Sequence, residues 1–439
     1  DVYKRQVGDT HTDVKVRRLA IFFQDNLSLF KRLTLNLGLR YDRPIMSAFR
    51  FVGDYPNLDS LSPRLGFAFD LFGDYKTIVR ASYGVYHNKV LTQSFTYGLP
   101  GKENEYNYRK TLPGFVFTGS DEDILYIYRQ VVAPENLYSV IKYADPIPMD
   151  PNLELPSTRA YSAGFSQQLF GVITIDLDYI YKRDYNLATI NDLTPHTYVP
   201  VQWTDPYLNK TVTLYQKTDN NPPNYIYANA KNAYRRHHFV IVSLRKRMEK
   251  RWSAMASITY QDSRGNVDND VSDLWGYPPY SYDIDPYYSD PFRYGKLGLN
   301  RHWQIKILGT YLLPFNFSVT ATFKWMSGLT WAPYLPGYAA PLYTLRPYGY
   351  LGIYLEPRGS RTGPSGWLLN LNVTKTFRLI GGSRLELIGD LFNAFNNTYG
   401  TSIYTDPTGV YPVSKKSNFG QPSGLVEPIK LRLGARLTF

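Results

Sequence analysis

Residues 19–42 read LAIFFQDNLSLFKRLTLNLGLRYD, and this stretch decides the fold. Within 33–41 every second residue is large and apolar, whereas the residues between them are polar or small. A period of two is typical of a β-strand with one apolar and one polar face. The apolar residues of 19–29 pair with this strand across the short link 30–32, so the stretch is predicted to form a hairpin.

This hairpin suits either of two environments. A soluble sheet would bury the apolar face in a core, whereas a membrane barrel turns that face to lipid and keeps the polar face in its lumen. In a barrel, slipping the strand by one residue would turn Arg40 to lipid, at a cost of about 2–4 kcal/mol near the bilayer midplane. The rest of the chain has to decide between the two environments.

Composition excludes several classes of protein. The chain has 439 residues, 49 Lys and Arg against 37 Asp and Glu, 16% aromatic residues and no cysteine. No apolar run approaches the roughly 18 residues that a membrane helix needs, which excludes a helical membrane protein. The mean hydropathy of −0.35 is compatible with a barrel, whose strands are half polar. The absence of cysteine excludes disulfides, thiolate metal sites and thiol catalysis.

The same hairpin unit recurs along the chain and gives 13 predicted strands. The predicted pairs and the last, single strand are 19–29 with 33–42, 65–71 with 79–85, 161–170 with 173–181, 236–247 with 251–262, 296–313 with 315–327, 367–377 with 383–395, and 429–439.

Short and long connections alternate without exception. The tight turns lie at about 30–32, 72–76, 170–172, 248–250, 313–315 and 379–382. The long segments are 43–61, 87–156, 186–231, 263–292, 329–366 and 396–427. Structureless loops of this length argue against a compact soluble domain. The layout predicts an all-β fold, an antiparallel transmembrane β-barrel with short periplasmic turns and long extracellular loops.

Aromatic residues near the strand ends have two readings. They fit the aromatic girdles at the membrane interfaces, but Tyr and Trp also favour strands in ordinary sheets. The residues concerned are Tyr41, Tyr83, Tyr181, Trp252, Tyr260, Trp325 and Trp367.

Four stretches resemble one protein family. They are AIFFQDNLSLFKRLTLNLGLRYD, LSPRLGFAFDLFGDYKTIVRASYGVYH, LELIGDLFNAFNNT and the terminal KLRLGARLTF. Together they resemble the C-terminal barrel of TonB-dependent outer-membrane transporters, in particular the Oar-like group with an N-terminal carboxypeptidase-regulatory-like domain. The resemblance spans about residues 19–439, with the long loops unmatched.

The resemblance implies a domain organisation that strand parity can test. Family barrels have about 22 strands around a plugged lumen. If residue 439 lies in the periplasm, counting back through 13 strands places the start of the first strand outside the cell. Nine upstream strands that begin at a periplasmic plug would also end outside, so the two counts agree. We therefore expect 19–439 to be a partial TonB-dependent receptor barrel, the C-terminal part of a longer protein with a plug and an energy-coupling box. Residues 1–18 are expected to be a truncated leading segment, of which 1–6 resemble adapter-derived sequence.

The resemblance also implies a location, a function and partners. It implies the cell outer membrane of a Gram-negative bacterium and energised import of a scarce siderophore, oligosaccharide or peptide. The implied partners are the TonB complex, reached through the upstream region, the barrel assembly machinery, outer-membrane lipid and lipopolysaccharide, and an unknown small ligand. Within the barrel class, a surface adhesin, a secretion-related receptor and a passive porin remain alternatives.

The terminal strand resembles an assembly signal. In the family, alternating apolar residues and a final aromatic residue are recognised by the barrel assembly machinery, and here these are Leu433, Leu437 and Phe439. The alternative is a closing strand that pairs with the first strand of the barrel, and both roles can hold together.

Catalysis and nucleic-acid binding find little support. The six histidines show no metal-ligand spacing, and His237 and His238 are predicted to point to opposite faces of a strand. Nucleophile-elbow, phosphate-loop and dinucleotide motifs do not occur. Basic residues are scattered through the strands and form no single patch of the kind that binds nucleic acid. We therefore expect a protein that is no enzyme and carries no cofactor.

One long segment is the candidate ligand site. Residues 262–291 combine aromatic rings with carboxylates, which could hold a sugar, a peptide or a cationic chelate, although such loops are also common on solvated surfaces. Asp-x-Asp spacing could hold calcium, but the glycine and the terminal glutamate of a calcium loop are missing. The candidate residues are Trp275, Tyr277, Tyr280, Tyr282, Asp283, Asp285, Tyr287 and Tyr288.

Charged residues are expected on the inward face of the barrel. The carboxylates are Asp176, Asp178, Glu386 and Asp390, and the cations are Arg40, Arg64, Arg80, Lys324, Lys430, Arg432 and Arg436. The cations could steer an anionic substrate. They could equally pair with acidic residues of a plug or with the inward carboxylates.

Overall fold

The structure is a computed structural model of the chain. It describes residues 2–6, 14–48, 55–89, 105–109, 120–131, 136–141, 147–204, 208–222, 224–231, 233–266, 292, 294–297, 300–335, 353–403 and 419–439.

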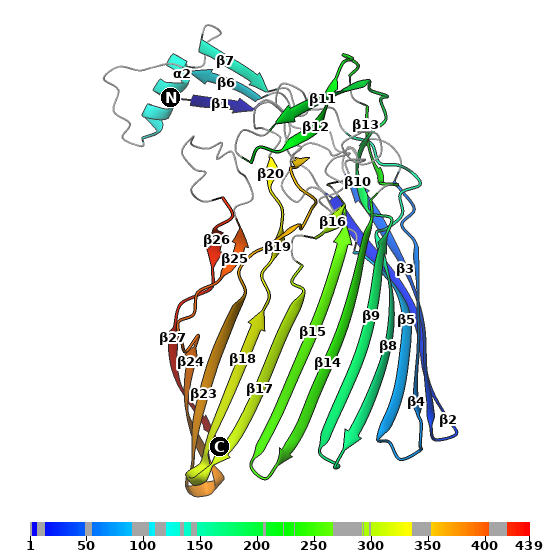
Figure 1. The fold of residues 1–439 in the computed structure, drawn as a ribbon. Coiled ribbons are helices and arrows are strands. Elements are labelled where there is room, and N and C mark those ends of the chain that lie inside the picture. Colours follow the sequence, from blue (N-terminus) through cyan, green and yellow to red (C-terminus); the bar gives the residue numbers. More distant parts are fainter. Residues whose placement is uncertain are drawn as a thin grey trace.

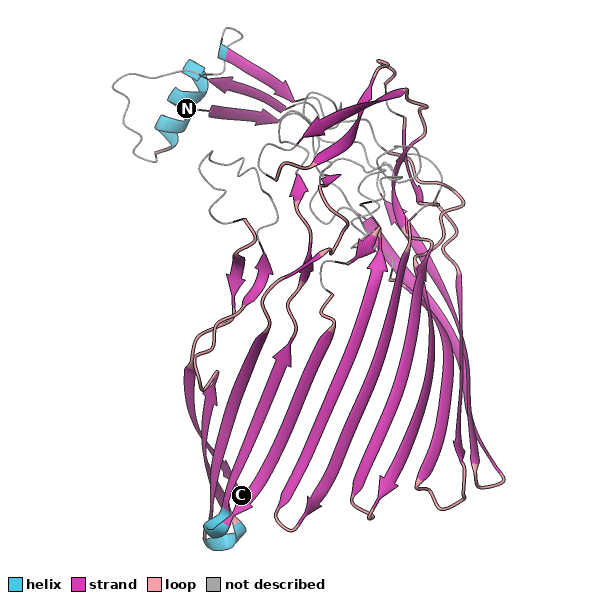
Figure 2. Ribbon diagram, viewed as in Figure 1, coloured by secondary structure: helices cyan, strands magenta, loops and turns pink. Residues whose placement is uncertain are grey.

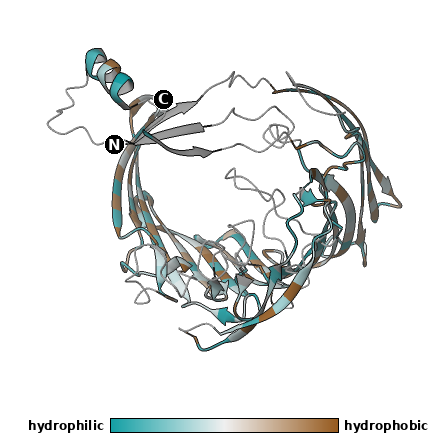
Figure 3. Cartoon of the chain, turned by 90° about the horizontal axis from the view of Figure 1, so that it is seen from above, coloured by the Kyte–Doolittle hydropathy of each residue, from teal (hydrophilic) through white to brown (hydrophobic). Residues whose placement is uncertain are grey.

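An antiparallel sheet of fourteen strands dominates the molecule and curves into a wall (Figure 1, Figure 3). Strands that follow one another along its path are neighbours in space, and β2 and β27 lie at its two ends. The path runs through β2 (Val14–Leu29), β3 (Leu33–Ala48), β4 (Ser60–Asp70), β5 (Thr77–His87), β8 (Ser157–Leu169), β9 (Ile173–Tyr185), β14 (Arg235–Glu249), β15 (Trp252–Gly265), β17 (Trp303–Leu313), β18 (Phe317–Met326), β23 (Gly366–Arg378), β24 (Arg384–Phe392) and β27 (Lys430–Thr438). The short strand β16 (Gly295–Lys296) pairs with β15 beside this path.

All six predicted hairpins are confirmed, and their turns lie together at one end of the wall (Figure 2). Short 3-10 turns, η4 (Pro314–Asn316) and η5 (Ile380–Gly382), form two of them. Several boundaries differ from the prediction, because β3, β4, β8 and β9 extend further toward the long connections than expected. Strand β2 begins at Val14, within the predicted leading segment, and β17 begins at Trp303 because Lys296 belongs to the separate β16. Strand β24 ends at Phe392, since Asn393 adopts a φ of +47°.

The opposite end of the wall carries the long connections. We expected these to be structureless, and that prediction was wrong for the described parts, which hold short sheets and a helix. The short sheets pair β1 (Val2–Gln6) and β7 (Leu137–Ile141) with β6 (Glu105–Arg109), β10 (Ala188–Asp192) with β13 (Tyr225–Asn229), β11 (Tyr198–Thr204) with β12 (Thr211–Lys217), β19 (Thr330–Trp331) with β22 (Arg361–Thr362), β20 (Tyr334–Leu335) with β21 (Ile353–Tyr354), and β25 (Gly400–Ile403) with β26 (Pro422–Leu425).

The helix, α2 (Asp121–Val131), belongs to the connection between β5 and β8. None of the helices in the described part of the chain is long and apolar enough to cross a membrane.

The register separates the two faces of the wall. Because directly paired residues point to the same face, Leu177 shares one face with Val242 and Ile258. These large apolar side chains are exposed, Leu177 by 47% and Ile258 by 46%. Buried apolar residues gather elsewhere, at the loop end, where they include Leu58, Met149, Leu153 and Tyr227. Among the described residues, no protein core therefore covers the apolar face of the sheet, as in a barrel wall that faces lipid.

An aromatic row follows this outer face near the loop end. The rings of Tyr83 and Tyr161 are 4.9 Å apart, those of Tyr161 and Tyr181 are 6.1 Å apart, and those of Tyr181 and His238 are 4.9 Å apart. Their continuity across four strands favours the girdle interpretation over isolated pair packing. Trp252, grouped with these aromatics in the sequence, instead begins β15 at the turn end.

Candidate functional site

The inner face of the wall carries the polar chemistry, and an ion-pair cluster crosses three strands there. The Arg80 guanidinium on β5 donates hydrogen bonds of 2.7 and 2.8 Å to both carboxylate oxygens of Asp178 on β9. The Arg80 Nη1 atom lies 3.6 Å from the Asp176 carboxylate. The Ser166 hydroxyl on β8 bridges Arg80 and Asp176, because it accepts a hydrogen bond from Arg80 and donates one to Asp176. The pair forms over Gly164, because a Cβ on that residue would lie 2.7 Å from Arg80 Nε.

Other predicted inward cations also find partners within the sheet. Arg432 Nη2 lies 2.7 Å from Asp390, which also accepts a 2.8 Å hydrogen bond from Asn372, and Arg436 lies 3.3 Å from Glu386. Of the two roles left open by the sequence, pairing with inward carboxylates is the one these arginines adopt. Fixed, neutralised pairs of this kind add little to a field that would steer an anion.

Two inward lysines differ from this pattern. Lys306 on β17 and Lys324 on β18 are direct cross-strand partners. The described residues contain no carboxylate ion-paired with either side chain, and like charges placed opposite each other are destabilising. Uncompensated positive charge therefore remains at this place on the described inner face.

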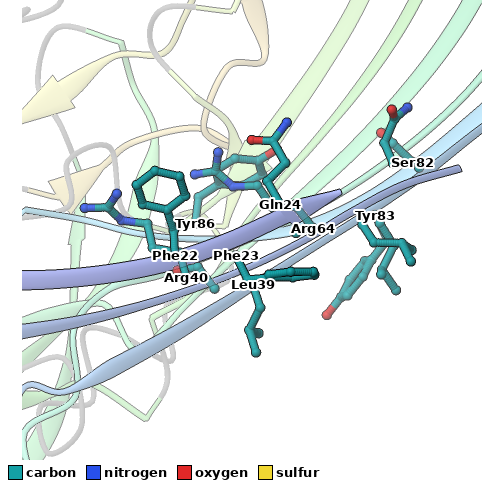
Figure 4. A pocket seen from close by; sticks show the side chains of 15 residues that line it. Phe22, Phe23, Gln24, Leu39, Arg40, Arg64, Ser82, Tyr83 and Tyr86 are labelled. Atoms are coloured by element: carbon teal, nitrogen blue, oxygen red, sulfur yellow. The ribbon is translucent and has the colours of Figure 1, made fainter. Parts of the chain in front are cut away.

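A pocket of about 510 Å³ lies against the inner face of β2 to β5 (Figure 4). Gly38 and Gly66 form part of its floor, and Phe22, Arg40 and Arg64 stand around it. Arg40 is held by a 2.7 Å ion pair with Asp42. Arg64 lies over the ring of Tyr86 at 5.0 Å. The pocket combines aromatic surface with fixed guanidinium groups, which suits a ligand with apolar and anionic parts.

Phe22 is a pocket residue that the sequence analysis missed. It pairs with Arg40 on the inner face and is 69% exposed, although its strand neighbours Ile21 and Phe23 belong to the outer face. The run Ile21-Phe22-Phe23 breaks the alternation, and that break was the available signal.

The loop end holds a buried histidine between two carboxylates. His196 Nε2 lies 2.9 Å from Asp192 and its Nδ1 lies 3.0 Å from Asp219. Because the two carboxylates meet opposite nitrogens of the ring, they do not converge on a common point where a cation could bind. The described residues hold no group of three or more potential ligands that could bind a metal.

A second loop-end pair fixes the segment between β21 and β22. Arg361 donates two 2.8 Å hydrogen bonds to the carboxylate of Glu356 and lies over the ring of Trp331 at 5.2 Å. The hydrogen bonds from Arg361 hold the pKa of Glu356 below its usual value. The loop-end segments are thus tied by charged groups as well as by short strands.

The predicted site residues divide into two groups. The ligand candidates lie outside the described residues, namely Trp275, Tyr277, Tyr280, Tyr282, Asp283, Asp285, Tyr287 and Tyr288. In the terminal strand, Leu433 and Leu437 are 76% and 53% exposed, and Phe439 is 96% exposed. The role of this strand as an assembly signal stays a prediction. His237 and His238 point to opposite faces, as predicted, since His237 bonds Ser263 and His238 bonds Tyr179.

Comparison with known proteins defines the class. The family profile described as "outer membrane beta barrel domain" matches residues 51–330, more than half of the chain. The chain therefore belongs to the outer-membrane β-barrel family, which places it in the Gram-negative outer membrane.

Proteins that the chain resembles are named as outer-membrane transporters and receptors, one of them a TonB-dependent transporter. The chain is 24% identical over 413 residues to the TonB-dependent transporter Oar of Myxococcus xanthus, in an alignment that covers 85% of this chain and 35% of Oar. The outer-membrane transporter YddB of Escherichia coli shares the fold with a TM-score of 0.55 at 13% identity, over 96% of this chain and 45% of YddB. The siderophore receptor PiuA of Acinetobacter baumannii gives a TM-score of 0.51 at 12% identity, over 97% and 43% of the two chains. The chain thus spans less than half the length of each of these relatives.

Proposed function

We propose that the chain forms the C-terminal part of the barrel of an energised outer-membrane transporter. The observation that carries the proposal is the two-sided wall, with an apolar outer face, a polar inner face, short turns at one end and long connections at the other. The likeness to Oar, named as a TonB-dependent transporter, supports it.

The proposal includes the size and limits of the barrel. The path from β2 to β27 supplies about 13 strands of a barrel of about 22, and upstream strands would pair with the free edges of β2 and β27. The partial barrel would begin with β2 at Val14, five residues before the start of the 19–439 expected from the sequence, and residues 1–13 would be its leading segment. The coverage of 35% of Oar is consistent with a larger protein that also holds a plug and an energy-coupling box.

The proposed activity is uptake of a scarce ligand through the lumen, driven by the TonB complex. The ligand would first meet the extracellular connections, including the aromatic and acidic segment 262–291, and the pocket around Phe22 and Arg40 would lie on its path. No catalytic step belongs to this role, and the relatives reported above are named as transporters and receptors. The barrel assembly machinery would recognise the terminal strand.

A transport assay tests this proposal. The full-length protein is expressed in a Gram-negative host that lacks its own receptors, and accumulation of labelled ferric siderophores, oligosaccharides and peptides is compared with and without a functional TonB gene. We expect at least one class to accumulate only when TonB is present. Equal accumulation without TonB, together with steady ion conductance in planar bilayers, would identify a passive porin and overturn the proposal.

A further inference from the structure

A buried histidine lies at the base of the β11–β12 hairpin, which extends beyond β10 and β13 at the loop end (Figure 1). Two connections join this hairpin to the β10–β13 sheet, residues 193–197 on the way in and 218–224 on the way out. His196 lies in the first connection, Asp219 lies in the second, and Asp192 is the last residue of β10. Contacts among these three residues therefore join both connections to the sheet below them.

Both carboxylates at this base are fixed by the backbone. Each of them accepts hydrogen bonds from two backbone amides. The donors are the amides of Thr194 and Asn224 for Asp192, and those of Thr197 and Asn221 for Asp219. A carboxylate that accepts several backbone N–H bonds is favoured in its ionised form. Asp192 and Asp219 therefore both bring a negative charge to the histidine.

Two acceptors on opposite nitrogens require a doubly protonated ring. His196 Nε2 lies 2.9 Å from Asp192 Oδ2, and Nδ1 lies 3.0 Å from Asp219 Oδ1. An ionised carboxylate only accepts hydrogen bonds, and a histidine donates from both nitrogens only as the imidazolium cation. In the neutral ring, one nitrogen would face a carboxylate oxygen with its own lone pair. The His196 side chain is 2% exposed, so water does not screen that contact.

The other ionisable groups that the neighbouring strands bring to this place are tyrosines. Tyr198 at the start of β11 meets the imidazole ring edge-on, with 6.4 Å between the ring centroids. Tyr225 at the start of β13 pairs with Asp192 in the sheet. Tyrosine is uncharged near neutral pH. The two carboxylates and the ring therefore carry one net negative charge when His196 is protonated and two when it is neutral.

The base holds the hairpin more firmly than its far end does. Lys210, just before β12, lies 3.9 Å from Glu356 in the segment between β21 and β22, but its side chain is 52% exposed, and exposed ion pairs contribute little. At the base, loss of the imidazolium charge would leave buried carboxylates without their cation, which is strongly destabilising. The Thr218 amide still bonds Thr197 across the base at 2.9 Å. Loss of the charge on His196 would therefore loosen the base without unfolding the hairpin.

We propose that His196 is a protonation-dependent clip that fixes the position of the β11–β12 hairpin at the loop end. With the ring doubly protonated, both carboxylates hold the base in the arrangement seen here. Loss of one proton removes one of the two contacts and frees the hairpin to move. The stabilisation is complete below about pH 6.5, where free histidine is protonated, and is lost as the pH rises and the folded protein releases the proton. The inference does not depend on the proposed uptake activity.

Distance measurements on the full-length protein in lipid test the proposal. Spin labels are placed at Thr213 on β12 and Ser257 on the inner face of β15, in protein that carries no other cysteine. Distance distributions are recorded by pulsed EPR at about pH 5.5 and about pH 9, on either side of the ordinary titration of histidine. Because one hydrogen bond between charged groups is lost, we expect the population of displaced hairpin to be about tenfold larger at the higher pH. His196→Gln should show the larger population at both pH values, whereas the control His238→Gln should respond to pH like the wild type.

Nitrogen NMR of the wild type reads the ring directly and does not require the variant to fold. At about pH 5.5 we expect both ring nitrogens of His196 to carry a proton, and at about pH 9 only one of them. A neutral His196 ring at the lower pH would overturn the proposal. The same holds for a wild-type distance distribution that does not change with pH, or for a His196→Gln protein whose distribution changes as much as that of the wild type.

Discussion

The two faces of the wall handle charge in opposite ways. On the inner face, arginines and carboxylates on neighbouring strands form pairs, as Arg80 does with Asp178 and Arg432 with Asp390. On the outer face, large apolar residues continue from strand to strand as far as the aromatic row near the loop end. The difference indicates two solvents, an aqueous lumen on one side and a bilayer with charged headgroups on the other.

The largest expected effect comes from placing the same charge on either face of β14. Val242→Arg would put a guanidinium group among Leu177 and Ile258 at the lipid face, at a cost of about 2–4 kcal/mol in the free energy of unfolding. Ser243→Arg would point inward beside Asp176 and is expected to be nearly neutral. Urea unfolding from lipid vesicles measures both, and equal losses for the two variants would break the distinction between the faces.

A smaller effect is expected from filling the space under the inner ion pair. Gly164→Val would force Arg80 and Asp178 apart and should cost about 1–3 kcal/mol, as overpacking usually does. Gly309→Ala is the control, because a Cβ at that glycine meets no atom within 4 Å. The same unfolding assay applies, and a Gly164→Val protein as stable as Gly309→Ala would show that the cluster adapts without loss.

The loop end offers a prediction about pH. Because the pKa of Glu356 is lowered in the folded protein, its pairing with Arg361 stabilises the segment above the usual carboxyl pKa of about 4.3, and this stabilisation is lost as the pH falls through the lowered value. Glu356→Gln should weaken the segment by about 1–2 kcal/mol at pH 7. Hydrogen exchange of residues 353–363 should therefore be faster in the variant at pH 7. If hydrogen exchange were unchanged in the variant, the short strands would be what orders this segment, and the Glu356–Arg361 pair would contribute nothing to it.

The smallest effect concerns the inward lysines. Lys324→Gln removes one charge from the opposed pair with Lys306 and should stabilise the sheet by about 0.2–0.5 kcal/mol. Thr322→Gln, one inward position away on the same strand, is the matched control for side-chain volume. A clear loss of stability in Lys324→Gln would mean that the lysine has a counterion that compensates its charge.

The fold could be predicted to a large extent because a period of two and a tight turn are local signals. Leu33–Tyr41 alternates cleanly, and its strand, face and turn all follow the prediction. The turns themselves were predictable in position only. Phe30 and Lys31 both adopt positive φ, a conformation that usually requires glycine or asparagine, so their residue types give no hint of the turn geometry.

Two kinds of feature could not be predicted from the sequence. The segment FVIV at 239–242 is apolar throughout, so its own residues do not show that Ile241 pairs with Asp178 and points inward. The ion-pair cluster around Arg80 and the His196 site join residues from different strands or loop positions. Their assembly depends on register across several strands, which no single stretch encodes.

The most direct test of the central claim is single-cysteine labelling along β14, to which residues 1–439 add no cysteine of their own. Spin labels at each position from 238 to 245 are exposed to oxygen, which partitions into lipid, and to a water-soluble nickel chelate. The account predicts strict alternation, with positions 240, 242 and 244 accessible to oxygen and the apolar position 241 sharing the inward environment of 243. Uniform accessibility along the strand, or grouping of 241 with its apolar neighbours, would contradict a barrel wall with this register.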